Sequence, residues 1–382
     1  MPHESSAGTL PVAQSAPLGD AATAESMWAV VFAGGIGSRF WPLSTPARPK
    51  PLLSLVSGNP LLADSVGRLQ PLIPPERVLV ATSRDIAPAI RTVVRDVPEE
   101  NILVEPRPLG TAAAMAWAAQ EVARRAGPET MLCAMHGDLA VSFPGEFREA
   151  VRRAASIAVN DGALVALGVR PTRPESQFGY LLPGAVLDAG APFVAAGALP
   201  VASFVEKPAE REASALADDG AFWHSGIVLG TAKQLLAELA ACTVEIAPGL
   251  PALTAGNLPA FVGMIRSVGI ERGLLERTER LLVLPCEFGW DDVGTWASLR
   301  RARELDDDGN GALGAVQFLD AASNVVHAEE GAVVAFGVSR LLIVTLPGLT
   351  FVTTIERAGD LKPLLDALPG SMRINPGSGT PR

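Results

Sequence analysis

The first half of the chain alternates between short apolar runs and longer amphipathic stretches. Residues 28–33 form a continuous apolar run with two β-branched valines, which is typical of a strand covered on both faces. The same criterion predicts further strands at 78–81, 102–104, 131–135 and 164–168. Helical periodicity and capping residues predict helices between them at 60–69, 85–95, 111–125 and 147–159. This order favours an α/β fold with a Rossmann-like, doubly wound and mostly parallel sheet, whose ligands bind at the carboxyl ends of the strands.

The pattern changes in the second half of the chain. Residues 170–290 have shorter β-rich runs and fewer clear helices, and we expect them to elaborate the same sheet on its substrate side. After an acidic, glycine-containing stretch at 306–311, short β-type runs separated by turn residues follow at 316–320, 323–328, 332–336, 341–345 and 350–354. They predict a small β-rich C-terminal appendage, either a β-solenoid or a plain meander, closed by a short helix at 359–368.

Length and composition refine this division. A chain of 382 residues exceeds what one compact core usually holds, so two domains are expected, at 27–305 and 312–370. Residues 1–26 are rich in Ala, Ser and Pro and lack the basic and apolar regions of a signal peptide, which predicts a disordered tail.

Charge and cysteine content exclude several classes of protein. The formal net charge of −10 argues against a nucleic-acid partner or an acidic membrane surface, and no apolar run approaches the ~18–20 residues of a membrane span. The three cysteines form no CxxC pattern, so neither a disulfide framework nor a zinc site is indicated. A cytoplasmic location fits these observations.

A glycine-rich loop with two cations follows the first strand. Gly34, Gly35 and Gly37 allow the backbone to turn and its N–H groups to converge on an anion. Arg39 offers a planar fork for phosphate oxygens and Lys50 a movable point charge, on a segment that prolines stiffen. The loop predicts a phosphate site, although a surface turn beside an incidental Arg and Lys would have the same composition.

Two common phosphate loops do not fit this segment. The dinucleotide-binding fingerprint needs a glycine where Phe40 stands, which disfavours an NAD-dependent dehydrogenase, and the P-loop sequence Gly-Lys-Ser/Thr is absent. The segment instead resembles the G-G-x-G-x-R…P-K signature of the sugar-nucleotide pyrophosphorylases. Its Arg-Phe-Trp-Pro-Leu-Ser run at 39–44 is most similar to the mannose-1-phosphate guanylyltransferase branch.

The resemblance implies a reaction in which a sugar 1-phosphate oxygen attacks the α-phosphorus of a nucleoside triphosphate and pyrophosphate leaves. Both substrates are anions, so catalysis needs neutralisation and in-line positioning rather than a protein nucleophile. By resemblance, Arg39 holds the departing pyrophosphate and Lys50 neutralises the α-phosphate. Asp138 and Asp292 would bind Mg²⁺, which needs few carboxylates besides phosphate and water.

The two aspartates lie in recognisable surroundings. Asp138 follows the strand at 131–135, and Asp292 lies in Trp-Asp-Asp-Val-Gly-Thr-Trp, close to the family's Trp-x-Asp-Val-Gly-x-Trp. Helix capping or a turn would explain either aspartate taken alone. Further family motifs assign the nucleotide contacts to Gly34, Gly35, Gly37, Thr111 and Gly137, and the sugar-phosphate contacts to Gly179, Glu206, Lys207 and His224.

The chain departs from the family at several motifs. Gly110 stands where Asn is usual, which weakens the inference to guanine. His224 replaces an Asn with an imidazole that can charge near neutral pH, although an ordinary core or surface histidine is the simpler alternative. Glu271 replaces an Asp, and the neighbours of Asp138 differ from the family's Pro-Ala-Asp-His.

The resemblance as a whole implies the activity of that branch: synthesis of GDP-mannose from GTP and mannose 1-phosphate with Mg²⁺. The departures leave a pyrophosphorylase for another pair, such as glucose 1-phosphate with UTP or dTTP, as the nearest alternative. A non-catalytic sugar-nucleotide sensor of the same fold is a further one, although retention of both cations and both aspartates argues against it. The β appendage suggests a homodimer formed through the C-terminal region.

Overall fold

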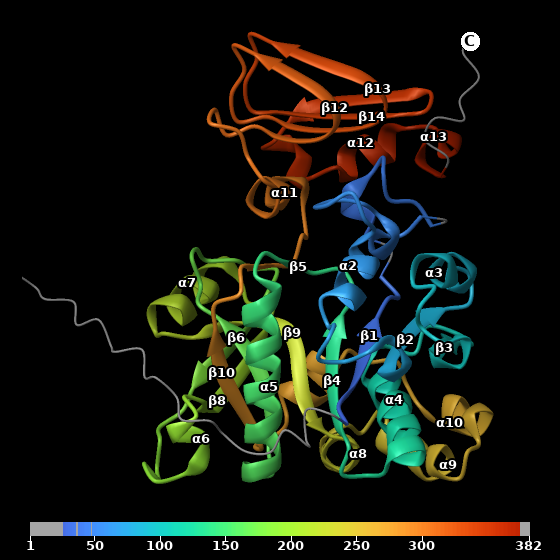
Figure 1. Cartoon of the computed structure of the whole chain (residues 1–382), viewed down its shortest axis with the longest axis vertical. Coiled ribbons are helices and arrows are strands. Elements are labelled where there is room, and N and C mark those ends of the chain that lie inside the picture. The colour runs from blue at the N-terminus through green and yellow to red at the C-terminus, as the bar shows by residue number, and fades with distance from the viewer. Residues whose placement is uncertain (1–25, 36, 47, 375–382) are drawn as a thin grey trace, which may run out of the picture.

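The computed structural model describes residues 26–35, 37–46 and 48–374. The tail predicted at 1–26 lies outside this part of the chain, apart from its last residue. Figure 1 shows a large α/β part below and a smaller β part above, which the chain enters through α11 (Trp296–Ala302).

A nine-stranded sheet forms the centre of the large part. Its strands, in spatial order, are β3 (Ile102–Glu105), β2 (Val78–Ser83), β1 (Trp28–Phe32), β4 (Met131–His136), β9 (Phe222–Thr231), β6 (Leu164–Val169), β10 (Leu281–Cys286), β8 (Leu199–Glu206) and β7 (Gly179–Pro183). The first four run parallel, β6 and β10 form a second parallel pair, and β9 lies antiparallel between the two groups. The predicted α/β fold is confirmed, and the carboxyl ends of β1, β4, β6 and β10 meet at one edge.

Helices cover both faces of this sheet. Successive side chains of a strand point to opposite sides, so one strand contributes to the packing on both faces. Val31 faces a core that includes side chains of α2 (Leu61–Gly67), α3 (Ala87–Val93) and α5 (Pro144–Asp161). Val30 faces the other core, with α4 (Thr111–Ala126), α8 (Ala232–Cys242), α9 (Leu250–Thr254) and α10 (Leu258–Met264). The continuous apolar run of β1 is therefore buried on both sides, as its sequence predicts.

The segment at 170–290 is more helical than its sequence predicts. Besides β7 and β8 it carries α6 (Pro192–Ala195), α7 (Glu210–Asp218) and three of the helices named above. α8 begins at a capping box, in which Thr231 and Gln234 satisfy each other's backbone N–H groups. Among the described residues no single helix could span a membrane by length and apolar content, and only α8 with residues 247–254 could do so as a pair, which is bent by 120°.

The C-terminal part is a four-stranded sheet of β12 (Gly311–Leu319), β13 (Val325–Phe336), β14 (Leu341–Leu346) and β15 (Leu349–Thr354). β12, β13 and β14 pair in parallel and only β15 returns antiparallel, so the solenoid-like alternative holds and the plain meander is wrong. The runs predicted at 323–328 and 332–336 form one strand, because the register shift opposite Leu313 and the positive φ of Gly331 make a bulge rather than a turn.

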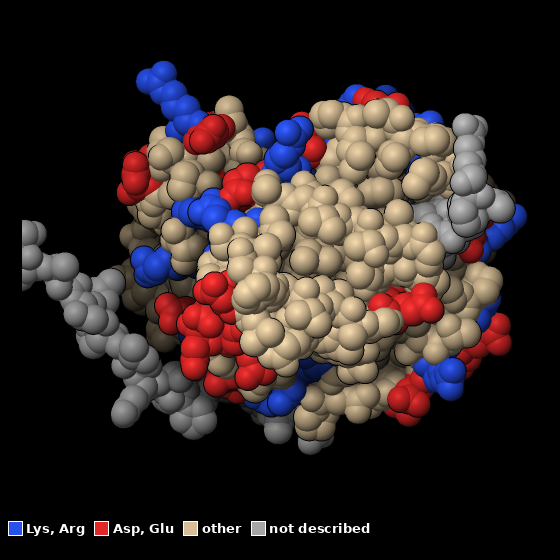
Figure 2. All heavy atoms as spheres, turned by 90° about the horizontal axis from the view of Figure 1, so that it is seen from above, with Lys and Arg blue, Asp and Glu red and all other residues tan. Residues whose placement is uncertain are grey.

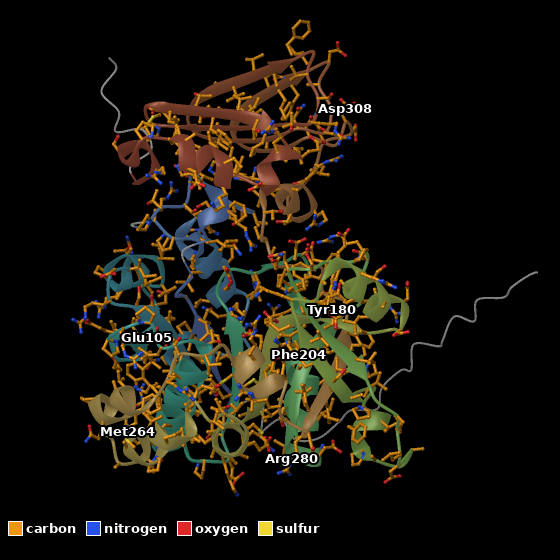
Figure 3. All side chains as sticks on the ribbon, turned by 180° about the vertical axis from the view of Figure 1, so that it is seen from behind. Glu105, Tyr180, Phe204, Met264, Arg280 and Asp308 are labelled. Carbon is orange, nitrogen blue, oxygen red and sulfur yellow. The ribbon has the colours of Figure 1, made fainter. Side chains whose placement is uncertain are left out.

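Within the described residues, two short helices follow β15, rather than the one predicted at 359–368. They are α12 (Lys362–Ala367) and α13 (Gly370–Ile374). Asp308, in the acidic stretch before β12, lies at one end of the C-terminal sheet (Figure 3).

The C-terminal sheet packs on the segment that carries the glycine-rich signature. A shared apolar core joins Phe40 and Leu55 of that segment to Trp296 of α11 and Leu342 of β14. The buried guanidinium of Arg303 donates to the carbonyls of Leu55 (2.6 Å) and Val326 (3.0 Å) across the same junction. The segment between Arg39 and Lys50 is thus held between two packed bodies.

Candidate active site

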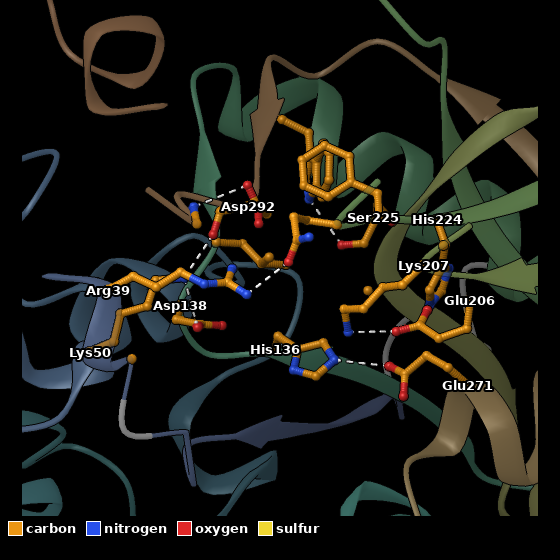
Figure 4. A pocket seen from close by; sticks show the side chains of 18 of the residues that line it. Arg39, Lys50, His136, Asp138, Glu206, Lys207, His224, Ser225, Glu271 and Asp292 are labelled. Atoms are coloured by element: carbon orange, nitrogen blue, oxygen red, sulfur yellow. Dashed lines mark hydrogen bonds and ion pairs between the residues drawn. The ribbon is translucent and has the colours of Figure 1, made fainter. Parts of the chain in front are cut away.

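A cavity of about 440 Å³ lies at the edge where the carboxyl ends of the parallel strands meet (Figure 4). Most of the predicted site residues line it: Gly37, Arg39, Lys50, Asp138, Gly179, Glu206, Lys207, His224 and Asp292. A neighbouring cavity of about 320 Å³ contains Gly34, Gly35 and Thr111. His136 and Asp138 line both, so the two cavities meet at the end of β4.

Two very short paired strands bring Asp138 and Asp292 together. β5 (Ala140–Val141) follows Asp138 almost directly and β11 (Trp290–Asp291) directly precedes Asp292. The two strands pair antiparallel, with Asp291 opposite Ala140. Residues far apart in the sequence therefore contribute carboxylates to one wall.

Lys50 links the two aspartates. Its buried ammonium lies 2.8 Å from Oδ2 of Asp138 and donates to the main-chain oxygen of Asp292 at 2.7 Å. Burial alone would raise the pKa of Asp138, but the charges of Lys50 and His136 outweigh it and hold that pKa below its ordinary value. Burial raises the pKa of Asp292 to about 6, with Lys50 only partly opposing the shift. Asp292 is therefore a desolvated carboxylate whose charge is incompletely compensated.

The pair of carboxylates fits a hard divalent cation. Oδ1 of Asp292 accepts from the N–H of Gly294 at 3.1 Å, and the remaining oxygens of Asp138 and Asp292 are the donor type that such an ion prefers. No group of three or more His, Cys, Asp or Glu side chains in the described ranges is arranged to hold a metal alone. An ion here would need phosphate oxygens or water to complete its coordination.

Gly37 is required by the position of Lys50. Its φ is +67°, and a Cβ built on it would lie 2.3 Å from Cβ of Lys50. Gly34 and Gly35 have no atom within 4 Å of such a Cβ and face the smaller cavity. Gly37 thus leaves room for the side chain of Lys50, whereas Gly34 and Gly35 leave open space beside the backbone.

We expect Gly37→Ala to destabilise the fold by about 1–3 kcal/mol, because the new methyl group must displace the stem of Lys50 at an unfavourable φ. Gly35→Ala is the matched control and should change the free energy of unfolding by less than about 0.5 kcal/mol. Urea denaturation of both variants measures the difference. Equal losses would contradict the steric role of Gly37.

The smaller cavity carries the nucleotide motif. Oγ1 of Thr111, at the start of α4, accepts from the N–H of Ile270 at 2.8 Å. Gly110 has φ +84°, and a Cβ there would lie 2.4 Å from the carbonyl oxygen of Val268, so the departure from Asn is imposed by this close approach. Burial raises the pKa of Glu105, which lines the same cavity, to about 7.

The opposite side of the large cavity is built by β7 and β8. Gly179 lies opposite Glu206 in their antiparallel register, and Nζ of Lys207 lies 2.6 Å from Oε1 of Glu206. Arg39 reaches across the opening to Gln177, with its guanidinium 2.8 Å from the amide oxygen. The cations of Arg39 and Lys207 therefore border the cavity from different sides.

One basic and one acidic group of the cavity, His136 and Glu271, were not predicted as site residues. Nε2 of His136 lies 3.4 Å from Oε1 of Glu271 (Figure 4). Burial would lower the pKa of His136, but Glu271 outweighs it and raises that pKa, while the imidazole lowers the pKa of Glu271 to about 2. At both positions the residue differs from the one usual in the family motifs, and this difference was the signal in the sequence that pointed to them.

The structure changes two other expectations from the sequence, one for His224 and one for Gly137. His224 is buried and edge-on to Phe204, and burial lowers its pKa to about 4, so the imidazole is neutral near pH 7 rather than charged. Gly137 is in neither cavity wall: its N–H donates to the carbonyl of Phe32 at 2.9 Å, and a Cβ there would meet Val31 at 2.9 Å. Its requirement for glycine comes from packing.

Two cavities share His136 and Asp138 in their linings, and beside them Lys50 contacts the carboxylate of Asp138 and the main-chain oxygen of Asp292. This arrangement suits a nucleotidyltransferase. Comparison with known proteins agrees, since the model of the nucleotidyl transferase family matches residues 28–309. The chain belongs to this family, and it is an enzyme of the mannose-1-phosphate guanylyltransferase type. Members generally use a divalent metal ion and act on a nucleotide and a sugar phosphate.

Individual relatives support this assignment. The mannose-1-phosphate guanylyltransferases of Klebsiella pneumoniae and Escherichia coli strain K12 are 30% and 31% identical, over 90% of this chain and 74% and 73% of their own lengths. A crystal structure named mannose-1-phosphate geranyltransferase, from Thermus thermophilus, superposes with a TM-score of 0.77 at 32% identity, covering 89% of this chain and 98% of that one. The family and activity expected from the sequence are confirmed.

Proposed function

We propose that this enzyme transfers the guanylyl group of GTP to mannose 1-phosphate, giving GDP-mannose and pyrophosphate, with Mg²⁺ as the metal. The observation that carries the proposal is the convergence of Lys50, Asp138 and Asp292 on one wall where a nucleotide cavity and a sugar-phosphate cavity meet. An oxygen of the sugar phosphate attacks the α-phosphorus, and the bond to the leaving pyrophosphate breaks in line with it.

The two cavities would hold the two substrates on either side of that point. The nucleoside triphosphate occupies the smaller cavity, where Gly34 and Gly35 leave room for phosphates beside the backbone and Thr111 lies at the start of α4. The sugar phosphate occupies the larger cavity, with Glu206 accepting from its hydroxyls and Lys207 near its phosphate. A Cβ on Gly179 would lie 2.5 Å from the ring of Phe204 and 2.9 Å from Oε2 of Glu206, so glycine lets these side chains pack beside β7.

The charged groups would divide the phosphate charge between them. Lys50 is placed to neutralise the α-phosphate, and Arg39, at the mouth of the cavity, to hold the departing pyrophosphate. Asp138 and Asp292 would hold Mg²⁺, which supplies charge neutralisation at the reacting phosphate. No side chain needs to act as a nucleophile.

The test is a turnover panel. Purified enzyme is given each combination of GTP, UTP and dTTP with mannose 1-phosphate and glucose 1-phosphate, and pyrophosphate release is measured. We expect the highest kcat/KM with GTP and mannose 1-phosphate. A preference for glucose 1-phosphate with UTP or dTTP would replace the proposed substrates, and nucleotide binding without pyrophosphate release would show a sensor.

His224→Asn, which restores the residue usual in the family, tests sugar recognition. Since burial lowers the pKa of His224 to about 4, the imidazole is neutral from pH 6 to 8, and its replacement should change KM for the sugar phosphate without altering the pH profile in that range. The measurement is KM for each substrate at several pH values. A pH profile that changes near neutrality in the variant would contradict a neutral His224.

The proposal includes a homodimer formed through the C-terminal sheet, in the cytoplasm. Leu319, Val334 and Phe336 are exposed large apolar side chains of this sheet. Figure 2, which looks onto it from above, shows a broad area with few charged side chains. We expect twice the chain mass of 39.7 kDa by light scattering, and the mass of one chain for Phe336→Lys. A wild-type monomer would contradict the dimer.

A further inference from the structure

A separate cavity of about 390 Å³ lies behind one wall of the substrate cavity. Phe178 and Trp290 line both, so their rings separate the two spaces. The other walls come from the segments that leave β6 and β10, where Arg170 follows β6 and Glu287 follows β10 directly. β6 and β10 are neighbouring parallel strands with Val169 opposite Cys286. Their carboxyl ends form the kind of crevice in which α/β proteins bind ligands.

Three arginines line this cavity in a chain whose net charge is −10. Arg173 lies 5.0 Å over the ring of Trp223 and 3.3 Å from Glu175, and Arg301 pairs with Asp291 at 2.9 Å. Arg170 lies 6.0 Å from the ring of Phe222 and forms no ion pair within the described part of the chain. One cation of the cavity is therefore available for an anion.

The remaining lining suits a sugar ring. Trp223, Phe178, Phe288 and Trp290 contribute an apolar wall. The buried Nε1 of Trp223 has no hydrogen-bond partner among the described residues, and the carboxylates of Glu287 and Asp291 can accept from hydroxyl groups. The volume is close to that of the cavity assigned to a hexose phosphate, 390 against 440 Å³.

From these features we infer that the cavity is a second binding site for a hexose phosphate, with the phosphomonoester at Arg170 and the ring against the aromatic wall. This site is distinct from the one proposed for the reacting sugar phosphate. Its occupant lies against Trp290 and Asp291, which directly precede the metal-binding candidate Asp292 in the chain. Ligand in this cavity therefore lies beside the two residues that precede Asp292.

The test is calorimetric titration of the full-length enzyme with glucose 6-phosphate, whose C1 carries no phosphate and cannot supply the nucleophile. We expect saturable binding that weakens at least tenfold in Arg170→Ala. Two matched variants should bind as the wild type does. Lys207→Ala removes a cation from the substrate cavity, and Arg211→Ala removes an exposed arginine of α7 that lines neither space.

Several results would overturn the inference. These are the absence of saturable binding, undiminished binding by Arg170→Ala, or a loss in Lys207→Ala, which would place the ligand in the substrate cavity. Inorganic phosphate that binds as tightly as glucose 6-phosphate would overturn recognition of the sugar. Because the titration uses neither GTP nor mannose 1-phosphate, its outcome is independent of the turnover panel.

Discussion

Asp292→Asn should lower kcat/KM on the order of 10³-fold while the fold stays intact. The amide oxygen of Asn can still accept from the N–H of Gly294, so the local turn is kept, but the charge that would hold the metal is lost. Stability should be unchanged or higher at pH 7.5. A carboxyl group whose pKa is raised on folding, here to about 6, binds its proton more tightly in the folded chain, so its charged form disfavours folding at that pH.

The neighbouring aspartate provides the matched control. Asp291 accepts from the N–H of Val293 at 2.8 Å and pairs with Arg301, and its side chain lies outside the lining of the substrate cavity. Asp291→Asn should keep kcat/KM within about tenfold of the wild type, because Asn preserves the acceptor for Val293. Pyrophosphate release at saturating Mg²⁺ and thermal unfolding measure both variants. Near-wild-type turnover by Asp292→Asn would refute the metal assignment.

The parts of the site that sequence predicted are those encoded by contiguous residues. β1, Gly37 and Lys50 lie in one signature, and the strand pattern before the loop places the glycines at the carboxyl end of the sheet. Asp138 was predicted for the same reason, since it follows β4. The meeting of Asp138 with Asp292 was implied only by resemblance, because β5 and β11 are two residues each and too short to show alternation.

The features that sequence missed depend on contacts between distant elements. His136 ends β4 and Glu271 begins a π-helix at Glu271–Leu275, and no local pattern reveals that the two side chains meet. The neutral state of His224 follows from its burial beside Phe204, whereas the sequence shows only that a titratable side chain stands at this position. In the C-terminal sheet, alternation of side chains with a period of two predicts strands but not whether neighbouring strands run parallel or antiparallel. The sequence therefore could not distinguish a solenoid from a meander.

Lys50 lies in a part of the chain that packs against the C-terminal sheet. Lys50 belongs to a short helical turn whose neighbours Phe40 and Leu55 are fixed in the core shared with the C-terminal sheet. Arg48, just before it, forms a bidentate pair with Glu329 of β13 at 2.7 and 2.6 Å. The C-terminal sheet therefore packs against the residues that flank the lysine, although it lines neither cavity.

Lys50→Met should abolish measurable turnover and also destabilise the fold by about 3 kcal/mol. The ammonium is buried and the carboxylate of Asp138 only a quarter exposed, so removing the cation leaves a charge without its partner, and Asp138 loses the group that lowers its pKa. The figure lies at the lower end for broken buried pairs because water still reaches Asp138. Urea denaturation and pyrophosphate release measure the two effects separately.

A double variant distinguishes the electrostatic role of Lys50 in stability from its role in catalysis. In Lys50→Met with Asp138→Asn, neither charge remains, so most of the lost stability should return, with a coupling free energy of about 1–3 kcal/mol in the double-mutant cycle. Turnover should not return, since the cation for the α-phosphate and a metal-binding carboxylate are both gone. Additive losses of stability would show that the two side chains are not coupled. Turnover by Lys50→Met within tenfold of the wild type would remove Lys50 from the mechanism, because no other described cation lies within 4 Å of Asp138.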